Sequence, residues 1–314
     1  MRILVTGSRG FVGRWVGAEI ERAGHEWIPE AGPEEDPGGR LEVTDRTAVL
    51  ARLAATRPDA VVHLAAISSG SATARDPGRA IFIAVAGTVA VVDGLAASMA
   101  LTGRRATLLV AGSGEVYGAP AEDDLPLDED APVRPATQYA VTKLAQESIA
   151  LRYGSAAGIR VIAVRAFNHT GPGQTTAFAV PAFAARIVAA RAARSTMIAV
   201  GDLDLRRDLT DVRDVAAAYR HLLEVAAVDS LPREGLVVNV ASGRSVLLRD
   251  VVAELADLAG TVIRPVTDPT LVRVGEAREI RGDPARLRAL TGWQPIIPLR
   301  QTLTDILAGF ESNV

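Results

Sequence analysis

The glycine-rich loop near the N-terminus constrains the fold of this chain more than any other feature. A short apolar run, Ile3-Leu-Val5, leads directly into Gly7-Ser-Arg-Gly10-Phe-Val-Gly13, and an amphipathic helix then continues to about Ala23. Glycines permit a tight turn and a close approach of the backbone, so a pyrophosphate can accept hydrogen bonds from free N–H groups at the helix N-terminus. This strand, turn and helix together predict a dinucleotide-binding site.

The alternation of strand and helix continues through the first half of the chain. Further runs rich in valine and isoleucine lie at Ala60–Leu64, Thr107–Val110 and Arg160–Val164, with helical stretches between them. Such runs are typical of strands that are buried on both faces of a parallel sheet with right-handed crossovers. The sequence therefore predicts an α/β fold with a Rossmann-type, doubly wound parallel sheet.

The rhythm changes after Asn168, where Thr170-Gly-Pro-Gly173 interrupts the pattern. We expect a dinucleotide-binding domain over residues 1–166 and a smaller C-terminal α/β substrate domain over residues 167–314. Another strand-like run, Val237–Ala241, follows a helix that begins near Val212. It predicts that the chain returns to the main sheet around residues 207–243.

Composition excludes several classes of protein. The formal net charge is -3 and the arginines are scattered, so no basic stripe for nucleic acid is present. The absence of cysteine excludes disulfides, thiol nucleophiles and cysteine-ligated metals, and we expect no metal site. No apolar run approaches the ~20 residues of a membrane span, and the N-terminus lacks a signal-peptide layout. We therefore expect a cytoplasmic protein with no membrane partner.

Charged residues near the glycine loop bear on the choice of cofactor. The second expected strand, His25–Glu30, ends in an acid where a carboxylate would accept hydrogen bonds from a ribose 2′-hydroxyl, which favours NAD. Arg9 lies inside the loop and could pair with a 2′-phosphate, which favours NADP. Three further acids at residues 34–36 would repel that phosphate. NAD is the expected cofactor, and NADP is the alternative.

Lys143 is the only lysine among 34 basic residues, and it follows Tyr139 by four positions. On a helix, this spacing places a phenol and an ammonium group on one face. A nearby positive charge favours the phenolate form and brings the phenol closer to general acid–base work at neutral pH. An ordinary exposed helix pair is the alternative interpretation of these two residues.

The glycine loop, Tyr139 and Lys143 together resemble the extended short-chain dehydrogenase/reductases, which include nucleotide-sugar epimerases, dehydratases and reductases. The resemblance covers nearly the whole chain, and the runs at residues 168–174 and 201–208 are most similar to GDP-4-keto-6-deoxy-D-mannose reductases. Six further segments carry it: Leu41–Asp45, His63–Ala66 after the fourth strand, Gly112–Gly118 after the fifth, Arg165–Gln174, Arg206–Asp214 and Thr291–Pro295.

The resemblance implies roles for four catalytic side chains. Ser113 would hydrogen-bond the reacting sugar oxygen, and Tyr139 would exchange a proton with the oxygen on carbon 4. Lys143 would hold the nicotinamide ribose and lower the pKa of Tyr139, while a hydride moves between the cofactor and carbon 4. Glu115 is either a base or a structural hydrogen-bonding acid.

The same resemblance implies two sets of binding residues. Arginine suits the second set because a guanidinium group can contact phosphate through two hydrogen bonds. The cofactor set comprises Gly7, Arg9, Gly10, Phe11, Val12, Gly13, Glu30, Glu42, Val43, Leu64, Ala65 and Ala66, together with Tyr139 and Lys143. The substrate set, for a nucleotide-diphosphate sugar, comprises Ser113, Glu115, Asn168, Arg207 and Arg273. A homodimer is also implied, formed through two helices per subunit, of which one carries Tyr139.

Four positions depart from the family pattern: Ala84, Gln138, Leu209 and Val274. Ala84 replaces an asparagine, which would weaken a structural hydrogen bond. Val274 replaces a proline next to Arg273, which makes the phosphate clamp less secure. Gln138 and Leu209 replace a frequent proline and phenylalanine.

The expected function is the reduction of a nucleotide-linked 4-keto-6-deoxyhexose, with GDP as the expected nucleotide. Glu115 keeps dehydration open because a lone glutamate could take the carbon-5 proton. Epimerisation at carbon 4 also stays open, and His169 is expected to be a substrate-pocket or packing residue. A non-catalytic regulator that senses the dinucleotide is the alternative from a different class, and the Ser113, Tyr139 and Lys143 set argues against it.

Overall fold

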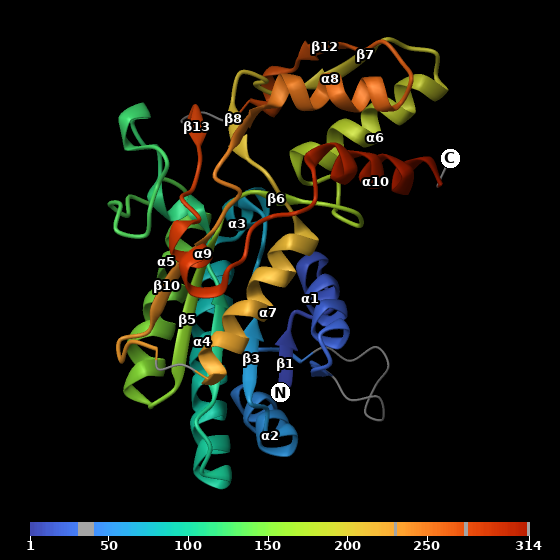
Figure 1. The fold of residues 1–314 in the computed structure, drawn as a ribbon. Helices are drawn as coiled ribbons and strands as arrows, with labels where there is room; N and C mark the ends of the chain where they lie inside the picture. Colours follow the sequence, from blue (N-terminus) through green and yellow to red (C-terminus); the bar gives the residue numbers. More distant parts are fainter. Residues whose placement is uncertain (31–40, 229–230, 273–275, 313–314) are drawn as a thin grey trace.

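A six-stranded parallel sheet forms the centre of the protein (Figure 1). The structure is a computed structural model and describes residues 1–30, 41–228, 231–272 and 276–312. The strand order is β10-β5-β4-β3-β1-β2, which confirms the expected Rossmann-type, doubly wound sheet. The strands are β1 (Arg2–Thr6), β2 (Glu26–Pro29), β3 (Ala60–His63), β4 (Thr107–Ala111), β5 (Arg160–Ala166) and β10 (Leu236–Val240).

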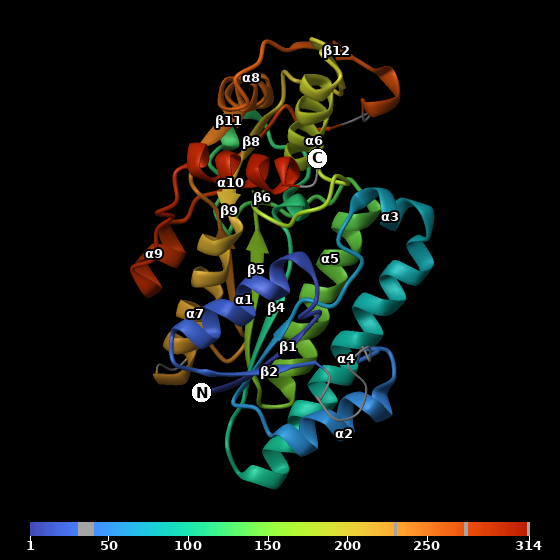
Figure 2. The same cartoon turned by 90° about the vertical axis from the view of Figure 1, so that its right-hand side faces the viewer.

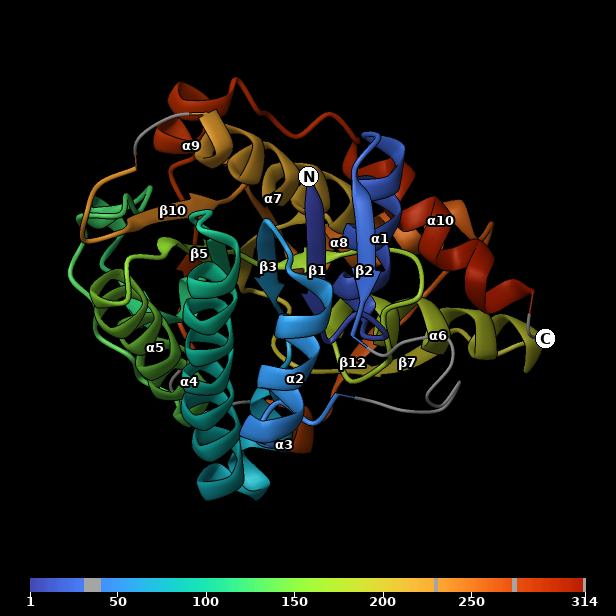
Figure 3. The ribbon, with the colours of Figure 1, turned by 90° about the horizontal axis from the view of Figure 1, so that it is seen from below.

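Helices cover both faces of this sheet, as Figure 3 shows when the molecule is seen from below. Alternate side chains of each strand enter opposite layers: Ile3 and Val5 join one apolar core, and Leu4 joins the other. This alternation explains why the strands are apolar throughout their length. The first face carries α1 (Phe11–Arg22) and α7 (Val212–Val228), and the second carries α2 (Arg46–Thr56), α4 (Pro77–Thr102) and α5 (Gln138–Ile149).

A second group of elements lies at the carboxyl edge of the sheet and has its own apolar core (Figure 2). Its main helices are α6 (Ala179–Ala192), α8 (Leu248–Leu258) and α10 (Leu299–Glu311), which pack with the paired strands β7 (Met197–Val200) and β12 (Arg264–Thr267). Strand β8 (Arg206–Asp208) lies between β11 (Ser245–Leu247) and β13 (Glu279–Ile280), and β6 (His169–Thr170) pairs with β9 (Thr210–Asp211).

Short elements complete the described chain. They are α3 (Gly70–Arg75), α9 (Ala285–Thr291), the 3-10 turns η1 (Gly114–Tyr117), η2 (Glu122–Asp124) and η4 (Pro269–Leu271), and the π-helical turn η3 (Ala150–Gly154). Strand β10 pairs with β5 at the edge of the main sheet, and α7 packs in the layer of α1. The division into domains at residue 167 stays a prediction.

The expected strand numbering counts one strand more before His63 than the described residues contain. Residues 41–45 contain a turn at Val43 and Thr44, and residues 34–36 lie outside the described residues. His63 therefore ends the third described strand and Ala111 ends the fourth. Val43 is buried and packs against Gly87 of α4.

The expectation that no apolar run approaches the length of a membrane span was also wrong. Helix α4 is long and apolar enough by composition, with a mean hydropathy of 2.1 over an 18-residue window. Half of that window is buried inside the protein. Core helices pass the same test of length and composition, because a helix packed between a sheet and other helices is apolar over much of its surface.

Candidate active site

The glycine loop makes a tight turn between β1 and α1. Gly7 has a φ of +70°, a left-handed conformation that favours glycine, and its carbonyl accepts a hydrogen bond of 2.9 Å from Gly10 N–H. A Cβ atom on Gly13 would clash with the Gly7 carbonyl and would lie 2.7 Å from Ser8 Cα. Because both obstacles are backbone atoms, the first turn of α1 can approach the loop closely only with glycine at position 13.

Two of the expected cofactor segments contact this loop. Glu30, which is 5 % exposed, accepts a hydrogen bond of 2.5 Å from Gly7 N–H through Oε2. The N–H of Ala65 donates to Thr6 Oγ1 at 3.3 Å, and a Cβ atom on Gly7 would come within 3.0 Å of Ala65 N. The structure thus brings Glu30, Leu64 and Ala65 together with the glycine loop.

A cavity of about 400 Å³ opens beside the loop. It combines two guanidinium groups with one carboxylate, so it can accept either a ribose hydroxyl or a phosphate group. Arg14 was missed in the sequence, although it lies one helical turn after Gly10 and could have been found by that spacing. The lining residues are Ser8, Arg9, Arg14, Trp27, Pro29 and Glu30.

Phe11 extends the loop toward the second group of elements. Its ring is stacked on His169, with 6.3 Å between the ring centroids and 7° between the planes. Nδ1 of His169 lies 3.0 Å from the carbonyl oxygen of Phe167, which can only accept, so Nδ1 carries the proton. Burial lowers the pKa of His169, and the hydrogen bond to Phe167 opposes this effect in part. His169 therefore packs as a neutral ring against the glycine loop, and Val12 is partly buried beside Phe11.

Ser113 and Tyr139 form the centre of the expected proton-transfer site. Ser113 precedes η1 and its Oγ accepts a hydrogen bond of 3.2 Å from Glu115 N–H. Burial raises the pKa of Tyr139, the charge of Glu115 raises it further, and a side-chain hydrogen bond with Ser113 lowers it in part. The phenol is thus held in its protonated form next to Ser113.

Lys143 occupies the same face of α5, one turn after Tyr139. Its Nζ donates to the Ala111 carbonyl oxygen at 2.7 Å and to Gln146 Oε1 at 3.0 Å. Burial lowers the pKa of Lys143 to about 8. Gln146 was missed in the sequence, although its i+3 position on the same helix was a usable signal. These bonds orient the ammonium group and leave one of its three protons for another acceptor.

The predicted effect of Lys143 on the Tyr139 phenol differs from what the structure shows. The pKa of Tyr139 is raised rather than lowered, because burial and the charge of Glu115 outweigh the hydrogen bond with Ser113. Glu115 is fixed near the start of α5 by Thr137, whose hydroxyl donates to Glu115 Oε2 at 3.3 Å and accepts from Ala140 N–H at 3.0 Å. The sequence did not suggest that Thr137 would join the cap of this helix to the acid.

His63, at the end of β3, lies near Lys143. Its Nδ1 is 2.8 Å from Thr6 Oγ1, and within the described part of the chain its buried Nε2 has no hydrogen-bond partner. Burial lowers the pKa of His63 to about 3, with a further contribution from the charge of Lys143. His63 is therefore a neutral side chain at neutral pH, and Lys143 is the charged group of this pair.

A buried ion pair fixes α5 against β5. Arg165 donates to both carboxylate oxygens of Glu147, at 2.7 and 3.1 Å, and to the Tyr117 hydroxyl at 3.1 Å. Tyr117 in turn donates to Asn239 Oδ1 at 2.8 Å, which extends the network to β10. Because bidentate pairs define orientation as well as distance, this network holds the helix of Tyr139 and Lys143 in one position on the sheet.

Three expected site residues, Glu42, Val43 and Asn168, contact neither the glycine loop nor the side chains of Ser113, Tyr139 and Lys143 in the contacts described below. The exposed Glu42 accepts hydrogen bonds from the N–H and hydroxyl groups of Thr44, at 3.2 and 2.9 Å. Val43 is 3 % exposed and packs against Gly87 of α4. Asn168 has an exposed side chain, and its carbonyl accepts a hydrogen bond of 3.0 Å from Thr210 N–H. These contacts do not join Glu42 or Val43 to the glycine loop.

Arg207 lies on β8, in the second group of elements. Its side chain is only 8 % exposed and is 3.1 Å from Glu276. Arg273, the other expected phosphate ligand, lies outside the described residues, as does Val274.

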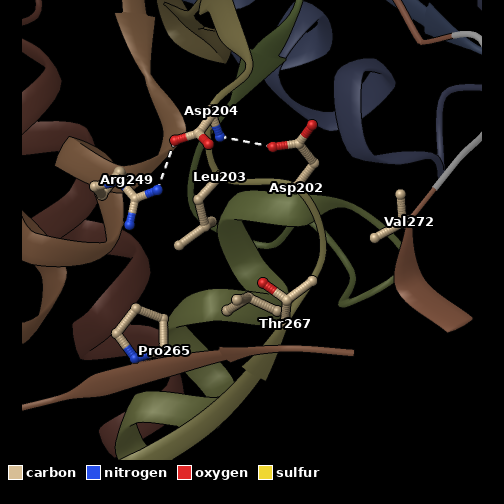
Figure 4. Close-up of a pocket in the computed structure, with 8 residues that line it drawn as sticks. Asp202, Leu203, Asp204, Arg249, Pro265, Thr267 and Val272 are labelled. Carbon is tan, nitrogen blue, oxygen red and sulfur yellow. Dashed lines mark hydrogen bonds and ion pairs between the residues drawn. The ribbon is translucent and has the colours of Figure 1, made fainter. Parts of the chain in front are cut away.

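A second cavity, of about 290 Å³, lies between β7, β12 and the start of α8 (Figure 4). Arg249 pairs with Asp204 at 2.5 Å, and Asp204 N–H donates to Asp202 Oδ1 at 2.8 Å. The charged groups that line this cavity therefore have partners within the protein. None of the expected site residues that the structure describes lines this cavity. Across the described ranges, no three His, Asp or Glu side chains lie close enough to hold a metal ion.

Comparison with known proteins agrees with this geometry. The model of the NAD dependent epimerase/dehydratase family matches residues 3–241. The chain is 38 % identical to the GDP-6-deoxy-D-mannose reductase of Pseudomonas aeruginosa over 314 residues, which cover 100 % of this chain and 98 % of that protein.

Solved structures show the same similarity. The structure of RMD from Pseudomonas aeruginosa complexed with NADPH has a TM-score of 0.87 and 37 % identity, and the match covers 100 % of this chain and 99 % of that chain. The UDP-glucose 4-epimerase of Thermus thermophilus in complex with NAD has a TM-score of 0.82 and 26 % identity, with full coverage of both chains. The fold and the arrangement of the glycine loop, Ser113, Tyr139 and Lys143 thus occur in a chain that is similar to nucleotide-sugar enzymes along its whole length.

Proposed function

The chain belongs to the NAD dependent epimerase/dehydratase family, and from this we propose that it reduces a GDP-linked 4-keto-6-deoxyhexose at carbon 4 with NAD(P)H. The chemical part of this proposal rests on Ser113 and Glu115 lying close enough to Tyr139 to shift its pKa, and on Lys143 lying one turn after Tyr139 on α5. The choice of reduction is supported by 38 % identity to a reductase over the whole chain, against 29 % to a UDP-glucose 4-epimerase.

The residues at the glycine loop fit a dinucleotide. Backbone atoms of Gly7 and Ser8 leave no room for a Cβ atom at position 13, so glycine is required there. Glu30 accepts a hydrogen bond from Gly7 N–H in the loop. Arg9 and Glu30 line one cavity, so the loop has groups for a ribose hydroxyl and for a 2′-phosphate. When bound, the nicotinamide supplies the hydride that is added to carbon 4.

Tyr139 supplies the proton that completes the reduction. As the carbon-4 carbonyl becomes an alcohol, the phenol gives its proton to the oxygen and the solvent later restores it. The raised pKa of Tyr139 keeps the phenol protonated at neutral pH, which is the form that a proton donor needs. Ser113 donates a hydrogen bond to the same oxygen, where negative charge develops.

Lys143 is placed to hold the ribose of the cofactor. Two of its N–H groups are held by Ala111 and Gln146, so the third points in a fixed direction and is suited to a ribose hydroxyl. We assign Lys143 the role of holding the nicotinamide ribose.

The substrate's nucleotide diphosphate is assigned to the second group of elements. Asn168 has an exposed side chain next to His169, which stacks on the glycine loop. Arg207 provides a guanidinium group for phosphate oxygens. We retain Arg273 as a second phosphate ligand on the basis of the sequence.

Glu115 gives the second candidate function, dehydration, a specific basis. Its carboxylate is close enough to Tyr139 to raise the phenol pKa, and Thr137 holds it there. A base in this position could remove the carbon-5 proton. In the reductase, Glu115 is a structural acid that keeps Tyr139 protonated.

Turnover with a panel of GDP-, dTDP-, UDP- and CDP-linked sugars and both cofactors tests the proposal. Reduction predicts that one NAD(P)H is consumed for each GDP-linked 4-keto-6-deoxyhexose. A redox-neutral conversion would instead support an epimerase or a dehydratase, and cofactor binding without any turnover would support a regulator.

We also propose a homodimer in which α4 and α5 of two copies pack together. Apolar side chains on these helices are exposed: Ile81 and Phe82 are 39 % and 59 % exposed, and Val141 is 45 % exposed. Since only half of the apolar window of α4 is buried within one chain, a second copy would cover the rest. The cytoplasmic location stays a prediction.

A further inference from the structure

Trp15 joins α1 to the loop of residues 168–174, which follows β5. Its indole N–H donates a hydrogen bond of 3.2 Å to the carbonyl oxygen of Pro172, which is 157 positions away in the chain. At the start of the same helix, the ring of Phe11 is stacked on His169. Two aromatic side chains in the first turns of α1 therefore contact two points of one distant loop.

The indole ring of Trp15 is itself held in place. It is partly buried against the core of the main sheet, and the guanidinium group of Arg213 lies over it, 5.8 Å from the ring centroid. Arg213 in turn pairs with Asp211 of β9 at 2.8 Å and with Asp305 of α10 at 2.7 Å. The N–H group of the indole therefore has a defined direction toward the loop.

Hydrogen bonds inside this loop connect Pro172 to its first residues. Gln174 is only 8 % exposed; its Oε1 accepts a hydrogen bond of 2.7 Å from the Thr170 hydroxyl, and its Nε2 donates to the carbonyl oxygen of His169 at 3.1 Å. Because these bonds tie the end of the loop to its beginning, a shift at Pro172 also shifts Asn168.

We propose that Trp15 is a positioning residue, which holds the loop of Asn168 in register with the helix that follows the glycine loop. This inference rests on the proposed function, in which the glycine loop binds the cofactor and Asn168 contacts the sugar nucleotide. Hydride transfer requires its two reactants within a narrow range of distances and orientations. Trp15 connects the two binding regions directly, so it influences turnover through Asn168 without contacting the reacting atoms.

Trp15→Phe tests this role, because it keeps an aromatic ring beneath Arg213 and removes the N–H donor. With the loop held less firmly, kcat for reduction of a GDP-linked 4-keto-6-deoxyhexose should fall about two- to tenfold, the range for the loss of one hydrogen bond. The affinities for NAD(P)H and for GDP, each measured by calorimetric titration, should change less than about twofold, since the glycine loop and β8 are unaltered. A role in stability alone would leave kcat of the folded protein unchanged.

Hydrogen exchange of the ligand-free chain gives a second readout, which does not depend on turnover. The N–H groups of Gln174 and Thr210 donate to the carbonyl oxygens of Gly171 and Asn168, at 3.3 and 3.0 Å. These amides report how often the loop opens. In Trp15→Phe they should exchange about two- to tenfold faster than in the wild type, because the loop has lost its hydrogen bond to α1.

Trp293→Phe is the matched control. The buried indole of Trp293 donates a hydrogen bond of 3.0 Å to the carbonyl oxygen of Asp214, so the substitution removes a bond of the same kind outside the loop. It should lower the temperature of thermal unfolding. Both kcat and the exchange of residues 168–174 should stay within about twofold of the wild type.

A double variant tests whether Trp15 acts through Asn168. Asn168→Ala alone should lower kcat/KM for the sugar nucleotide. In that background, Trp15→Phe should lower kcat by less than about twofold, because the loop no longer carries the substrate contact. Cofactor binding and the circular dichroism spectrum verify that these variants are folded.

Unchanged kcat or unchanged exchange in Trp15→Phe overturns the inference. Weaker binding of NAD(P)H or GDP by this variant, an equal fall in kcat for Trp293→Phe, or an undiminished fall in the Asn168→Ala background also overturns it. If Asn168→Ala lowers kcat/KM while Trp15→Phe behaves as the wild type, only this inference fails. If the wild type does not reduce the sugar, or Asn168→Ala leaves kcat/KM unchanged, the proposed function or its substrate contact fails with it.

Discussion

The ammonium group of Lys143 donates a hydrogen bond of 2.7 Å to the carbonyl oxygen of Ala111, the last residue of β4. This bond connects the helix that carries Tyr139 to the strand that leads into Ser113. Because the ammonium group is buried, its pKa is lowered to about 8. The chain's only lysine thus links the two halves of the proton-transfer site and titrates near physiological pH.

Lys143 predicts the alkaline limb of the pH profile. The protonated form is the active one, so kcat/KM for reduction should fall as the pH rises through about 8, where the buried ammonium group loses its proton. Tyr139 adds no limb in this range, since its pKa is raised. Lys143→Arg should remove the limb because arginine stays protonated, although its wide fork lowers kcat. Steady-state kinetics over about four pH units, from pH 6 to 10, measure this fall in kcat/KM. If Lys143→Arg keeps the same alkaline limb, another group causes it.

Gly13→Ala should impair cofactor binding. The added Cβ would lie 2.7 Å from Ser8 Cα and would clash with the Gly7 carbonyl, so the loop and α1 must separate. We expect NAD(P)H affinity to fall by at least about tenfold and stability to fall by about 1–3 kcal/mol. Fluorescence titration and thermal unfolding measure both. Gly309→Ala in α10 is the control, because its Cβ has no neighbour within 4 Å. Undiminished binding by Gly13→Ala would show that the loop is not the dinucleotide site.

Arg9→Ala should change the preference between cofactors. If Arg9 pairs with the 2′-phosphate, kcat/KM for NADPH falls about tenfold or more, whereas kcat/KM for NADH falls less than about twofold. Arg22→Ala provides a control at the far end of α1, since Arg22 is exposed and pairs with Glu19 at 2.7 Å. Equal losses with NADH and NADPH would mean that Arg9 does not read the 2′ position.

Phe82→Glu should separate the proposed homodimer. Phe82 is 59 % exposed on α4, and a charge there would be buried between two copies without a partner. Light scattering should give a dimer for the wild type and a monomer for the variant. Ile296→Glu, at a position 77 % exposed and outside α4 and α5, should remain dimeric. A monomeric wild type, or a dimeric Phe82→Glu, contradicts the interface.

The sequence predicted the sheet well because its strands are apolar on both faces. The expected runs at Ala60, Thr107 and Arg160 begin at the residues where β3, β4 and β5 begin. The residues of the glycine loop, Glu30 and Ala65 also meet as expected, since the carboxyl ends of parallel strands share one edge.

The surroundings of the site residues depend on tertiary contacts, which the spacing of residues along the sequence does not reveal. Gln146 and Ala111 orient Lys143, and the raised pKa of Tyr139 comes from burial and from Glu115. The contact between Arg207 and Glu276 joins residues far apart in the chain. Helix α4 was underestimated because Asp93 interrupts its apolar run, and only tertiary packing shows which part of its apolar surface is covered.

The most direct test compares wild type and Tyr139→Phe for NAD(P)H consumption with a GDP-linked 4-keto-6-deoxyhexose. The phenylalanine keeps the ring but cannot give a proton to the carbon-4 oxygen. The wild type should consume one NAD(P)H per sugar. Tyr139→Phe should bind the cofactor with unchanged affinity and lose about 10²–10⁴-fold in kcat. Near-normal turnover by Tyr139→Phe, or conversion of the sugar without net NAD(P)H consumption by the wild type, would contradict the account.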